Sequence, residues 1–527
     1  MILRKILASV CFLASALAAA GQEAAERRDF NFRTETDPVM FLSNPAAVSQ
    51  FSGHISMAEV YFRKDNGGLV SLTESPDAYK AGALTESYIS ISPKISFHGK
   101  LAWSYFSGQD MGGPILMEPD YNPVNFLESS EATAGQKNRE GYSLLGAMSY
   151  RFNEKWSSGV SFEYESADQT KVKDPRFSNI LMDMRIRAGV VFTPSERLLL
   201  GASLVYRNAM EKVRGGIYGT TDKQYFIYTD KGGFYGTMFE LSGDYNPIPM
   251  TEFKPMKNDF YGLSLQAISG IFSNELEVLY RDGFYGKKAS SSATFFEFSG
   301  VRAAYRADLT ATAGADLHHA TLKLDYELLG NNENVFKYVT PSGQNTRVEY
   351  SGQNHILDRN SIDAELGYVF YKGVGGYLPD FSAGITAKGH ARFLSTLIYP
   401  YYRNSDVITM TADAFAQKNF FSGKSVFSLD LGAGFRTGFG TPKEDGSYAS
   451  TSGSNLKSFD NYLYRQFEFD TASAAGGSLG FTYTYLFSDR FALYIKLSDD
   501  FSALLAEPQY LGGRFRNVAL ATIGCNF

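Results

Sequence analysis

Apolar and polar residues alternate with a period of two along much of the chain. In residues 142–152, "YSLLGAMSYRF", one face carries Tyr142, Leu144, Gly146, Met148, Tyr150 and Phe152, and the other carries mainly small or polar residues. Successive side chains of a β-strand point to opposite faces, so this pattern predicts a strand with one apolar face. The fold class that follows is all-β.

The second face carries charges in several of these segments. Lys323, Asp325 and Glu327 alternate with leucine and tyrosine, and residues 362–370 repeat the pattern with Asp363 and Glu365. Many apolar faces also end in aromatic residues. An apolar face with aromatic ends and a polar opposite face is typical of a strand that crosses a bilayer in a β-barrel. The alternative is a soluble sandwich or propeller, whose half-buried strands also alternate.

The connections between the predicted strands alternate between tight turns and long polar stretches. The turns are predicted at 97–100, 152–156, 192–197 and 486–491, and the outer loops at 109–141, 209–257, 329–360 and 437–473. Outer-membrane barrels have short periplasmic turns and longer outer loops. We therefore predict a transmembrane antiparallel outer-membrane β-barrel with an even number of strands, about 18 within a range of about 14 to 20.

The first 22 residues have a different character. Arg4 and Lys5 precede an apolar run over 6–17 and small residues over 18–21, which is the layout of a cleaved secretory signal. No later stretch approaches the roughly 18 apolar residues of a membrane-spanning helix. We expect residues 1–22 to be a cleaved signal peptide and the location to be the bacterial outer membrane.

Charge and cysteine content narrow the possibilities further. The formal net charge is -6 and no basic tract is present, so we expect no nucleic acid among the partners. Cys11 lies in the predicted signal and Cys525 is the second of two cysteines. Removal of the signal leaves no intramolecular disulfide to stabilise the fold.

The chain ends on an aromatic residue. Phe527 shares one face of a predicted last strand with Cys525, Ile523, Ala521 and Ala519. This segment resembles the C-terminal strand of bacterial outer-membrane proteins. The resemblance implies that Phe527 is the barrel-assembly signal, and that the barrel-assembly machinery and outer-membrane lipids are partners. Closing the barrel with this strand would also remove the sheet edges.

Charged side chains on the predicted strands are expected to face the barrel interior. A basic side chain facing lipid at mid-membrane costs about 2–4 kcal/mol. Mixed charges in the lumen are compatible with a solvated channel or with a salt-bridged, occluded interior, and the sequence leaves both open. The predicted lumen-facing residues are Glu163, Glu165, Arg197, Arg207, Lys323, Asp325, Glu327, Asp363, Glu365, Asp430 and Lys496.

A short motif precedes the first predicted strand. Residues 33–53, "RTETDPVMFLSNPAAVSQFSG", contain Asn44, Pro45 and Ala46. The motif resembles the N-terminal NPA element of FadL-type channels, in which the N-terminal segment folds into the barrel mouth as a hatch. The rest of the chain resembles an uncharacterised Bacteroidota family of outer-membrane barrels. These resemblances imply that Asn44, Pro45 and Ala46 form a gate or plug, with residues 23–53 entering the mouth or lumen and 54–527 forming a single barrel.

A TonB-dependent receptor is a different kind of large barrel, with a plug domain of more than about a hundred residues before its first strand. Only residues 23–53 lie between the predicted signal and the predicted barrel. The chain therefore does not have the layout of such a receptor, although it could associate with one.

The predicted outer loops contain repeated aromatic phrases. "DYNPVNF" at 120–126 is echoed by "DYNPIPM" at 244–250, and "GFYG" occurs at 233–236 and 283–286. Asp, Asn, Pro and Gly favour turns. One interpretation is that these loops pack over the barrel mouth. The other is a contact surface, because exposed aromatic rings offer large contact area; its candidates are Tyr225, Phe226, Tyr228, Phe234 and Tyr235.

Enzyme motifs receive little support. "GGSLG" at 476–480 fits G-x-S-x-G, but that motif requires a strand-to-helix elbow and here opens a predicted strand. Asp316 and His318 share a strand face, where solvated lumen residues are a simpler interpretation than a general base. Six histidines without HExxH or CxxC spacing predict no zinc site. We expect no enzyme activity, no catalytic residue, no metal and no cofactor.

Two functional hypotheses follow. The first is a channel or transporter for a small or hydrophobic nutrient, gated by the N-terminal segment. The second is a structural or accessory subunit of a larger outer-membrane uptake complex, with a TonB-dependent transporter or a surface lipoprotein as partner. The sequence does not identify the substrate.

Overall fold

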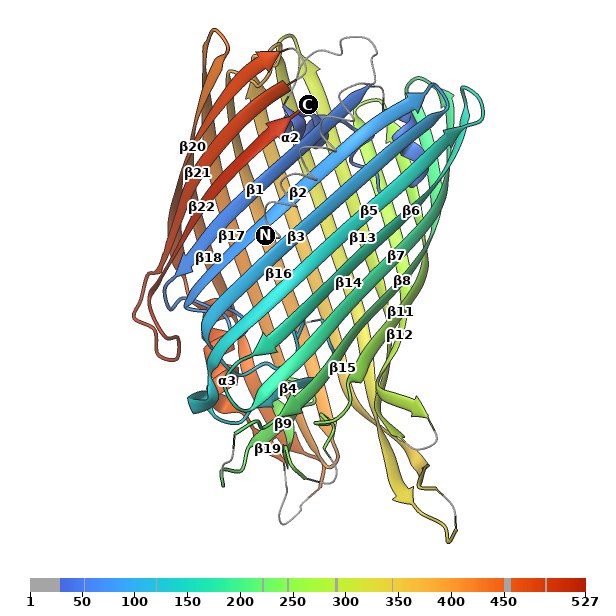
Figure 1. The fold of residues 1–527 in the computed structure, drawn as a ribbon, viewed down its shortest axis with the longest axis vertical. Coiled ribbons are helices and arrows are strands. Elements are labelled where there is room, and N and C mark those ends of the chain that lie inside the picture. Colours follow the sequence, from blue (N-terminus) through green and yellow to red (C-terminus); the bar gives the residue numbers. More distant parts are fainter. Residues whose placement is uncertain are drawn as a thin grey trace.

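The computed structural model describes residues 29–51, 53–119, 121–219, 222–243, 246–289, 292–343, 345–449, 456–488 and 491–527. Eighteen strands form one antiparallel sheet that closes on itself, because the first strand pairs with both the second and the last (Figure 1). The prediction of a closed barrel with an even strand number is confirmed. The wall strands are β1 (His54–Asn66), β2 (Asp77–Ser92), β3 (Ile95–Met111), β5 (Gly135–Arg151), β6 (Trp156–Lys171), β7 (Arg176–Ser195), β8 (Leu198–Gly216), β11 (Lys254–Ser269), β12 (Phe272–Ala289), β13 (Ser292–Ala313), β14 (Asp316–Val339), β15 (Arg347–Lys372), β16 (Phe381–Ile398), β17 (Tyr401–Ser422), β18 (Ser425–Ser447), β20 (Ala474–Ser488), β21 (Phe491–Leu504) and β22 (Phe515–Asn526).

The remaining elements lie at the two ends of the barrel. A short helix α2 (Phe30–Thr36) and a 3-10 helix η1 (Pro45–Gln50) precede the wall. A second sheet has the strand order β19 (Lys457–Ser458), β10 (Tyr235–Glu240), β9 (Phe226–Asp230) and β4 (Asn125–Glu128). The helices η2 (Glu131–Thr133) and α3 (Asp460–Thr471) complete the fold. None of the described helices is long and apolar enough to cross a membrane.

The outer face of the wall is apolar where lipid would meet it. Leu204, Leu366 and Leu431 are 68%, 59% and 53% exposed. An apolar band of this kind is costly in water and is favoured against hydrocarbon. Pairing every wall strand on both sides satisfies the backbone groups that a bilayer leaves without partners. The closed barrel and its apolar outer band are those of a bacterial outer-membrane protein.

Aromatic side chains mark both ends of the apolar band. Trp156 stacks on Phe192 with ring centroids 4.5 Å apart, close to the turn at 152–155. At the opposite end, Phe62 stacks on Tyr79 at 6.4 Å, and Tyr79 lies 6.1 Å from Tyr105. Rings at both levels are expected where a barrel meets the two headgroup regions.

The two ends of the barrel differ in their connections. Short turns such as 93–94, 196–197 and 270–271 join strands at the end where the C-terminus lies, which we call the turn end (Figure 1). The connections 112–134, 217–253 and 448–473 lie at the other end, the loop end. Short turns face the periplasm in outer-membrane barrels, so the turn end is periplasmic.

Two of the predicted boundaries were wrong. The predicted turn at 97–100 lies inside β3, and the chain turns at 93–94 instead. The predicted outer loop at 329–360 is mostly strand, because β14 continues to Val339 and β15 begins at Arg347. Figure 1 shows this hairpin projecting beyond the wall at the loop end. Beyond the membrane both strand faces meet water, so the alternation that identifies a strand disappears.

Candidate functional site

The candidate functional site is the barrel lumen together with the two groups of residues that close its ends. The first group is the N-terminal segment, which we define as residues 29–51. It contains α2 and η1 and lies inside the turn end. The second group is the loop layer, which we define as β4, β9, β10, β19 and α3; Figure 1 shows β4, β9, β19 and α3 at the loop end.

The N-terminal segment contacts opposite sides of the wall. Phe30 packs with Met57 of β1 and Tyr88 of β2. Phe32 packs with Leu317 and Tyr371 from β14 and β15. Strands β1 and β14 lie far apart around the barrel, so the segment crosses the lumen rather than following one wall.

The NPA motif lies where the segment packs most closely against the wall. Ala46 is 0% exposed, and its carbonyl accepts hydrogen bonds from the hydroxyls of Ser149 at 2.9 Å and Ser157 at 3.0 Å. η1 begins at Pro45, a favourable first helical position. Its N-cap is Asn44, whose side-chain oxygen accepts from the Ala46 N–H at 3.0 Å.

The Asn44 side chain also links the segment to the wall. Its amide nitrogen donates to the Gln266 side chain at 2.9 Å and to the carbonyl of Val190 at 3.1 Å. With a further bond to the carbonyl of Ala202 at 3.3 Å, Asn44 caps a helix and binds three strands with one side chain. Removal of the side chain would leave buried polar groups unpaired.

Glycines in the wall make room for the motif. A Cβ at Gly159 would lie 2.5 Å from the carbonyl carbon of Pro45, and a Cβ at Gly189 would lie 2.2 Å from the side-chain oxygen of Asn44. Both distances are far below van der Waals contact. The inner surface of β6 and β7 is shaped to this part of the segment.

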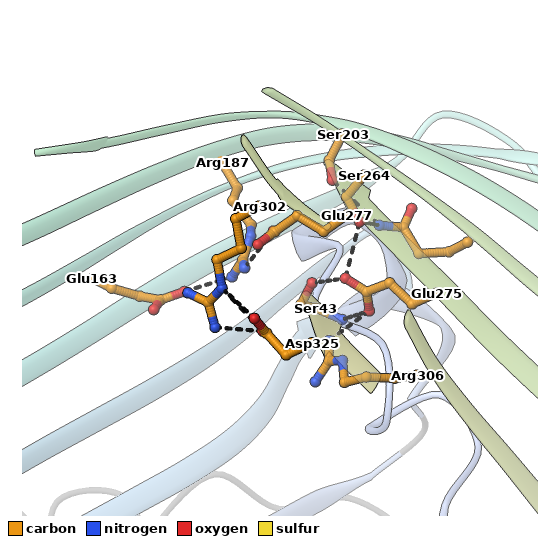
Figure 2. A network of polar contacts seen from close by, with 11 residues as sticks. Ser43, Glu163, Arg187, Ser203, Ser264, Glu275, Glu277, Arg302, Arg306 and Asp325 are labelled. Atoms are coloured by element: carbon orange, nitrogen blue, oxygen red, sulfur yellow. Dashed lines mark hydrogen bonds and ion pairs between the residues drawn. The ribbon is translucent and has the colours of Figure 1, made fainter. Parts of the chain in front are cut away.

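A carboxylate of β12 holds the residue before the motif. Both the backbone N–H, at 2.9 Å, and the hydroxyl of Ser43 donate to Glu275 (Figure 2). Glu275 also accepts from the Ser264 hydroxyl at 3.0 Å and from Arg306 at 2.7 Å. Four donors converge on this buried carboxylate, and Arg306 compensates its charge.

The first residue of the segment binds the periplasmic rim. The Asp29 carboxylate caps α2 by accepting from Asn31 N–H at 3.0 Å, and it accepts from the Asn526 side chain of β22 at 2.8 Å. Burial raises the pKa of the Asp29 carboxyl, and these hydrogen bonds oppose the rise. Burial also raises the pKa of Glu35, with the charge of Asp29 adding to the effect.

The loop layer closes the other end through an apolar core. Ile115, Phe126 and Ile227 are buried together with Met256, Tyr285 and Leu329 from the wall. Phe126 and Tyr285 have ring centroids 5.0 Å apart. Apolar packing between inward-folded chain and the inner wall fills the loop end of the lumen.

A buried charge network fixes the tip of the connection 112–134. Arg281 is 0% exposed and binds Glu327 at 2.6 Å, while Arg359 binds the other oxygen of Glu327 at 2.9 Å. Both guanidinium groups donate to the carbonyl of Tyr121, and the Arg281 guanidinium lies 4.3 Å from its ring centroid. The tip is held by two arginines from different wall strands.

Further ion pairs lie on the inner face of the wall, and one of them joins strands that are not neighbours (Figure 2). Arg187 of β7 bridges Glu163 of β6 at 2.8 Å and Glu277 of β12 at 3.0 Å. β7 and β12 are separated by β8 and β11 in the sheet, so this contact passes through the interior. Arg302 binds Asp325 through both oxygens.

Most of the predicted lumen residues lie on the inner face of the wall. Glu163 and Glu327 are placed by the contacts above, and Arg207 binds Asp183 at 2.9 Å. Lys323 binds Glu365 at 2.8 Å, and Asp363 binds His390 at 2.7 Å. Glu165 lines a lumen cavity, Lys496 lies near Glu35 of the N-terminal segment, and Asp430 pairs in register with Gly480 of β20.

The prediction that Arg197 faces the lumen was wrong. This residue is exposed in the turn at 196–197, where its carbonyl accepts from the Gly270 N–H at 2.9 Å. The alternation that places a charge on the inner face ends where the strand ends. A basic residue at the headgroup level needs no partner in the lumen.

The prediction of an exposed aromatic contact surface in the loops was also wrong, because none of its five residues is exposed. Tyr228 stacks on Phe459 with centroids 3.8 Å apart, and the Arg403 guanidinium lies 4.6 Å from the Tyr235 ring. Tyr225 packs against the apolar core, and Phe234 packs with Leu72 and Tyr462. Phe226 is half-buried in β9. These rings stabilise the loop layer.

The residues that the sequence analysis considered for catalysis do not lie in the arrangements that catalysis would need. Ser478 lies within β20 rather than at an elbow. Asp316 accepts from the Gly373 N–H at 3.2 Å, whereas His318 contacts the Tyr368 hydroxyl at 2.8 Å. Among the described residues, no group of three His, Cys, Asp or Glu side chains could hold a metal ion.

Phe527 closes the chain against the first strand. Its N–H donates to the carbonyl of Ser56 at 2.9 Å, and the Ser56 N–H donates back at 2.8 Å. Ile523, two positions before Cys525 on the same face, is 52% exposed on the outer surface. The last strand therefore completes the barrel with its apolar face outward.

The sequence analysis missed several residues of this site. Glu275, Glu277 and Arg281 occur in "ELEVLYRD", where charges alternate with Leu276 and Val278. The period-two rule used elsewhere would have placed Glu275 and Glu277 inside. Ser43 carries no comparable signal, because its contact depends on the path of the N-terminal segment.

The family model for a family of unknown function (DUF6850) matches residues 45–527. The chain belongs to this family. The matched residues begin at Pro45 of the NPA motif and include the whole barrel wall. No curated protein matches the sequence.

Solved outer-membrane structures resemble the chain at low identity. A Pseudomonas aeruginosa FadL homologue is 11% identical, with 97% of this chain and 96% of that chain covered and a TM-score of 0.31. The outer-membrane transporter YddB from Escherichia coli is 7% identical, with 89% and 80% covered and a TM-score of 0.39. The ferric preacinetobactin receptor BauA from Acinetobacter baumannii is 7% identical, with 90% and 80% covered and a TM-score of 0.38.

Proposed function

We propose that the protein is an outer-membrane transport barrel for a small nutrient, with the N-terminal segment as its periplasmic gate. The observation that carries this proposal is the binding of Ser43 by Glu275 inside the lumen. A gate needs a closed position held by contacts that can be broken. Hydrogen bonds and apolar packing hold this segment, and it contributes no strand to the barrel wall.

The charges on the inner face of the wall indicate which kind of nutrient the lumen suits. Between the two closures the inner face carries paired acids and bases, including Glu163 with Arg187 and Lys323 with Glu365. Charged groups that remain near water favour polar solutes over apolar ones. We therefore favour a small polar nutrient over the hydrophobic one that the sequence also allowed.

Passage also requires movement at the loop end. The loop layer is a separate sheet that contributes no strand to the wall. Lys231, in the turn between β9 and β10, binds Glu333 at 2.6 Å, at the last residue that β14 pairs with β13. The layer could therefore shift without breaking the barrel ladder, which is the behaviour expected of a lid.

The test is conductance in planar bilayers after removal of residues 23–50. The shorter chain should conduct more than the chain that begins at residue 23, because the turn end would be open. A matched control removes only residues 23–28 and leaves Asp29 and the rest of the segment in place. The same pair is also made without α3 (Asp460–Thr471) of the loop layer. If the long deletions fold as barrels and conduct no more than their controls in both backgrounds, the gate is disproved.

A second candidate function is an accessory subunit of an uptake complex, and the projecting hairpin of β14 and β15 favours it. The ladder of β14 with β13 ends at Glu333, and the ladder of β15 with β16 ends at Leu357. Beyond these residues the hairpin has two strand edges outside the wall ladders. Tyr338 and Tyr350 are exposed on it. Open edges and aromatic rings suit binding of another protein.

The accessory role is tested by affinity purification from native outer membranes in mild detergent. The wild-type chain is compared with a variant in which residues 336–350 are replaced by a tight turn. A stoichiometric TonB-dependent transporter or surface lipoprotein that is lost with the hairpin would support this role. Purification of the wild type as a lone barrel would argue against it.

A further inference from the structure

A lumen cavity of about 650 Å³ lies against β1, β2, β3, β5 and β6, below the loop layer. This size suits a small organic molecule. Six basic and three acidic side chains contribute to its lining. The lining therefore has more basic than acidic side chains, although Glu86 and Glu118 just outside it pair with Lys100 and Arg139.

Three of the basic residues form one row across the sheet. Arg63 of β1 lies directly opposite Lys80 of β2, and Lys80 lies opposite Phe106 of β3. Phe106 in turn lies opposite Arg139 of β5. Adjacent strands are about 4.8 Å apart. The row therefore holds three cationic side chains and Phe106, one from each of four neighbouring strands at the same level. Like charges in such positions repel one another.

The row faces the lumen. Arg139 contacts Glu118 at 3.3 Å, and Glu118 belongs to the inward-folded connection 112–134. The neighbouring residues Phe62 and Tyr79, one position before Arg63 and Lys80, stack on the outer face. The cationic row thus lies on the inner side of a wall whose outer side carries aromatic rings.

Acidic residues compensate only part of this row. Arg63 binds Asp65 at 2.7 Å, and Arg139 binds Glu118. For Lys80, which is half-buried in the cavity wall, no ion pair is found within the described part of the chain. The arrangement has the form of an anion-binding site with two positioned guanidinium groups and one available ammonium group.

The opposite wall provides a contrast. A cavity of about 440 Å³ there is lined by Lys323, Lys388 and His390. Lys323 binds Glu365 at 2.8 Å, Lys388 lies 3.8 Å from the same carboxylate, and His390 binds Asp363. Each of these bases has an acidic partner, whereas no ion pair of Lys80 is found among the residues that the structure describes.

We propose that the cavity around Lys80 binds a small soluble anion with several carboxylate or phosphate oxygens. This inference deepens the proposed transport function and rests on it only for the route by which the solute arrives. Arg63 and Arg139 would bind oxygens at the two ends of the row, and Lys80 would bind between them. Phe106 would contact an apolar part of the solute.

Calorimetric titration with citrate tests the site at constant ionic strength and pH 7.5. Citrate supplies three carboxylates, and glucose serves as the uncharged probe. The protein is the chain that begins at residue 23, in a neutral detergent. The chain without residues 23–50 is titrated in parallel, so that a closed entry path is not mistaken for an absent site.

Lys80→Gln should weaken citrate binding by about tenfold or more, because a charge-assisted contact is lost while the side chain keeps a similar length. Arg139→Gln is the second variant and should act in the same direction. The control is Lys323→Gln on the compensated wall, which should bind citrate like the wild type. Every variant is first checked for the heat-modifiable gel migration of a folded barrel.

The outcomes separate this site from the proposed gate. Absence of saturable citrate binding in both chain lengths overturns the site, as does equal affinity in the wild type, Lys80→Gln and Arg139→Gln. Glucose binding of similar strength also overturns it. Citrate binding that depends on Lys80 upholds the site even if the deletion of 23–50 leaves conductance unchanged, an outcome that would refute only the gate.

Discussion

Gly159 of β6 lies directly against the backbone of Pro45 in the N-terminal segment, and a Cβ at position 159 would be 2.5 Å from the Pro45 carbonyl carbon. The clash involves backbone atoms, so no side-chain rotation would relieve it. We expect Gly159→Ala to destabilise the docked segment by about 1–3 kcal/mol and to raise bilayer conductance towards that of the deletion variant.

Gly146→Ala in β5 is the matched control, because a Cβ at position 146 would meet nothing within 4 Å. Its conductance should equal that of the wild type. Equal conductance of the two alanine variants would show either that the segment is not a gate or that it adapts to the extra methyl group without leaving. Protease cleavage within residues 29–51 distinguishes these cases.

Glu275 provides a second way to release the segment. Glu275→Ala removes the acceptor of both Ser43 donors and leaves Arg306 without this partner. Loss of hydrogen bonds to a charged group should cost on the order of 1.5–3 kcal/mol, or at least about a tenfold increase in the released fraction. Conductance of single barrels measures this fraction. Glu365→Ala is the control, because it removes a lumen carboxylate bound to Lys323 instead of to the segment.

The barrel wall could be predicted from the sequence because one physical rule governs it. In β14, Lys323, Asp325 and Glu327 alternate with apolar residues, since one face meets lipid and the other meets the lumen. The same rule fails for residues 334–353, where both faces of the hairpin leave the membrane. It also fails at Arg197, where the strand has ended.

The closures of the lumen were harder to predict, because their contacts join residues distant in sequence. Ser43 and Glu275 are 232 positions apart, and no local pattern connects them. The NPA resemblance placed Asn44 near the barrel mouth, but not its contacts with Gln266 and Val190. The aromatic loop residues were expected at an open surface, whereas the structure places them half-buried within the loop layer.

The docked segment should respond to pH through Asp29 and Glu35. Burial raises the pKa of both carboxyls in the docked state, and the charge of Asp29 further raises that of Glu35, while His319 and Lys496 oppose this. A raised pKa means that docking is favoured by protonation. Docking is therefore firmest below the ordinary carboxyl pKa of about 4 and weakens as the pH rises through the raised values. Conductance should increase from pH 4 towards neutral pH.

Asp29→Asn combined with Glu35→Gln should flatten this pH profile. Asn remains a good N-cap for α2, so the helix start is preserved while the titrating charge is lost. A profile that keeps its slope in the double variant would assign the pH response to other groups of the lumen. Gly146→Ala, with both carboxyls intact, should retain the wild-type slope.

Glu327 should stabilise the loop end more than any surface pair does. It joins Arg281 and Arg359, which are 0% and 6% exposed, and both arginines also bind the Tyr121 carbonyl. Glu327→Gln leaves two buried guanidinium groups without their carboxylate, a change that costs about 3–5 kcal/mol. The midpoint of urea unfolding in detergent should fall accordingly. The control is Glu349→Gln, which removes an exposed carboxylate near the hairpin tip. It should leave the midpoint unchanged, since exposed ion pairs contribute little to stability. Equal midpoints for both variants would mean that the buried network does not hold the loop layer.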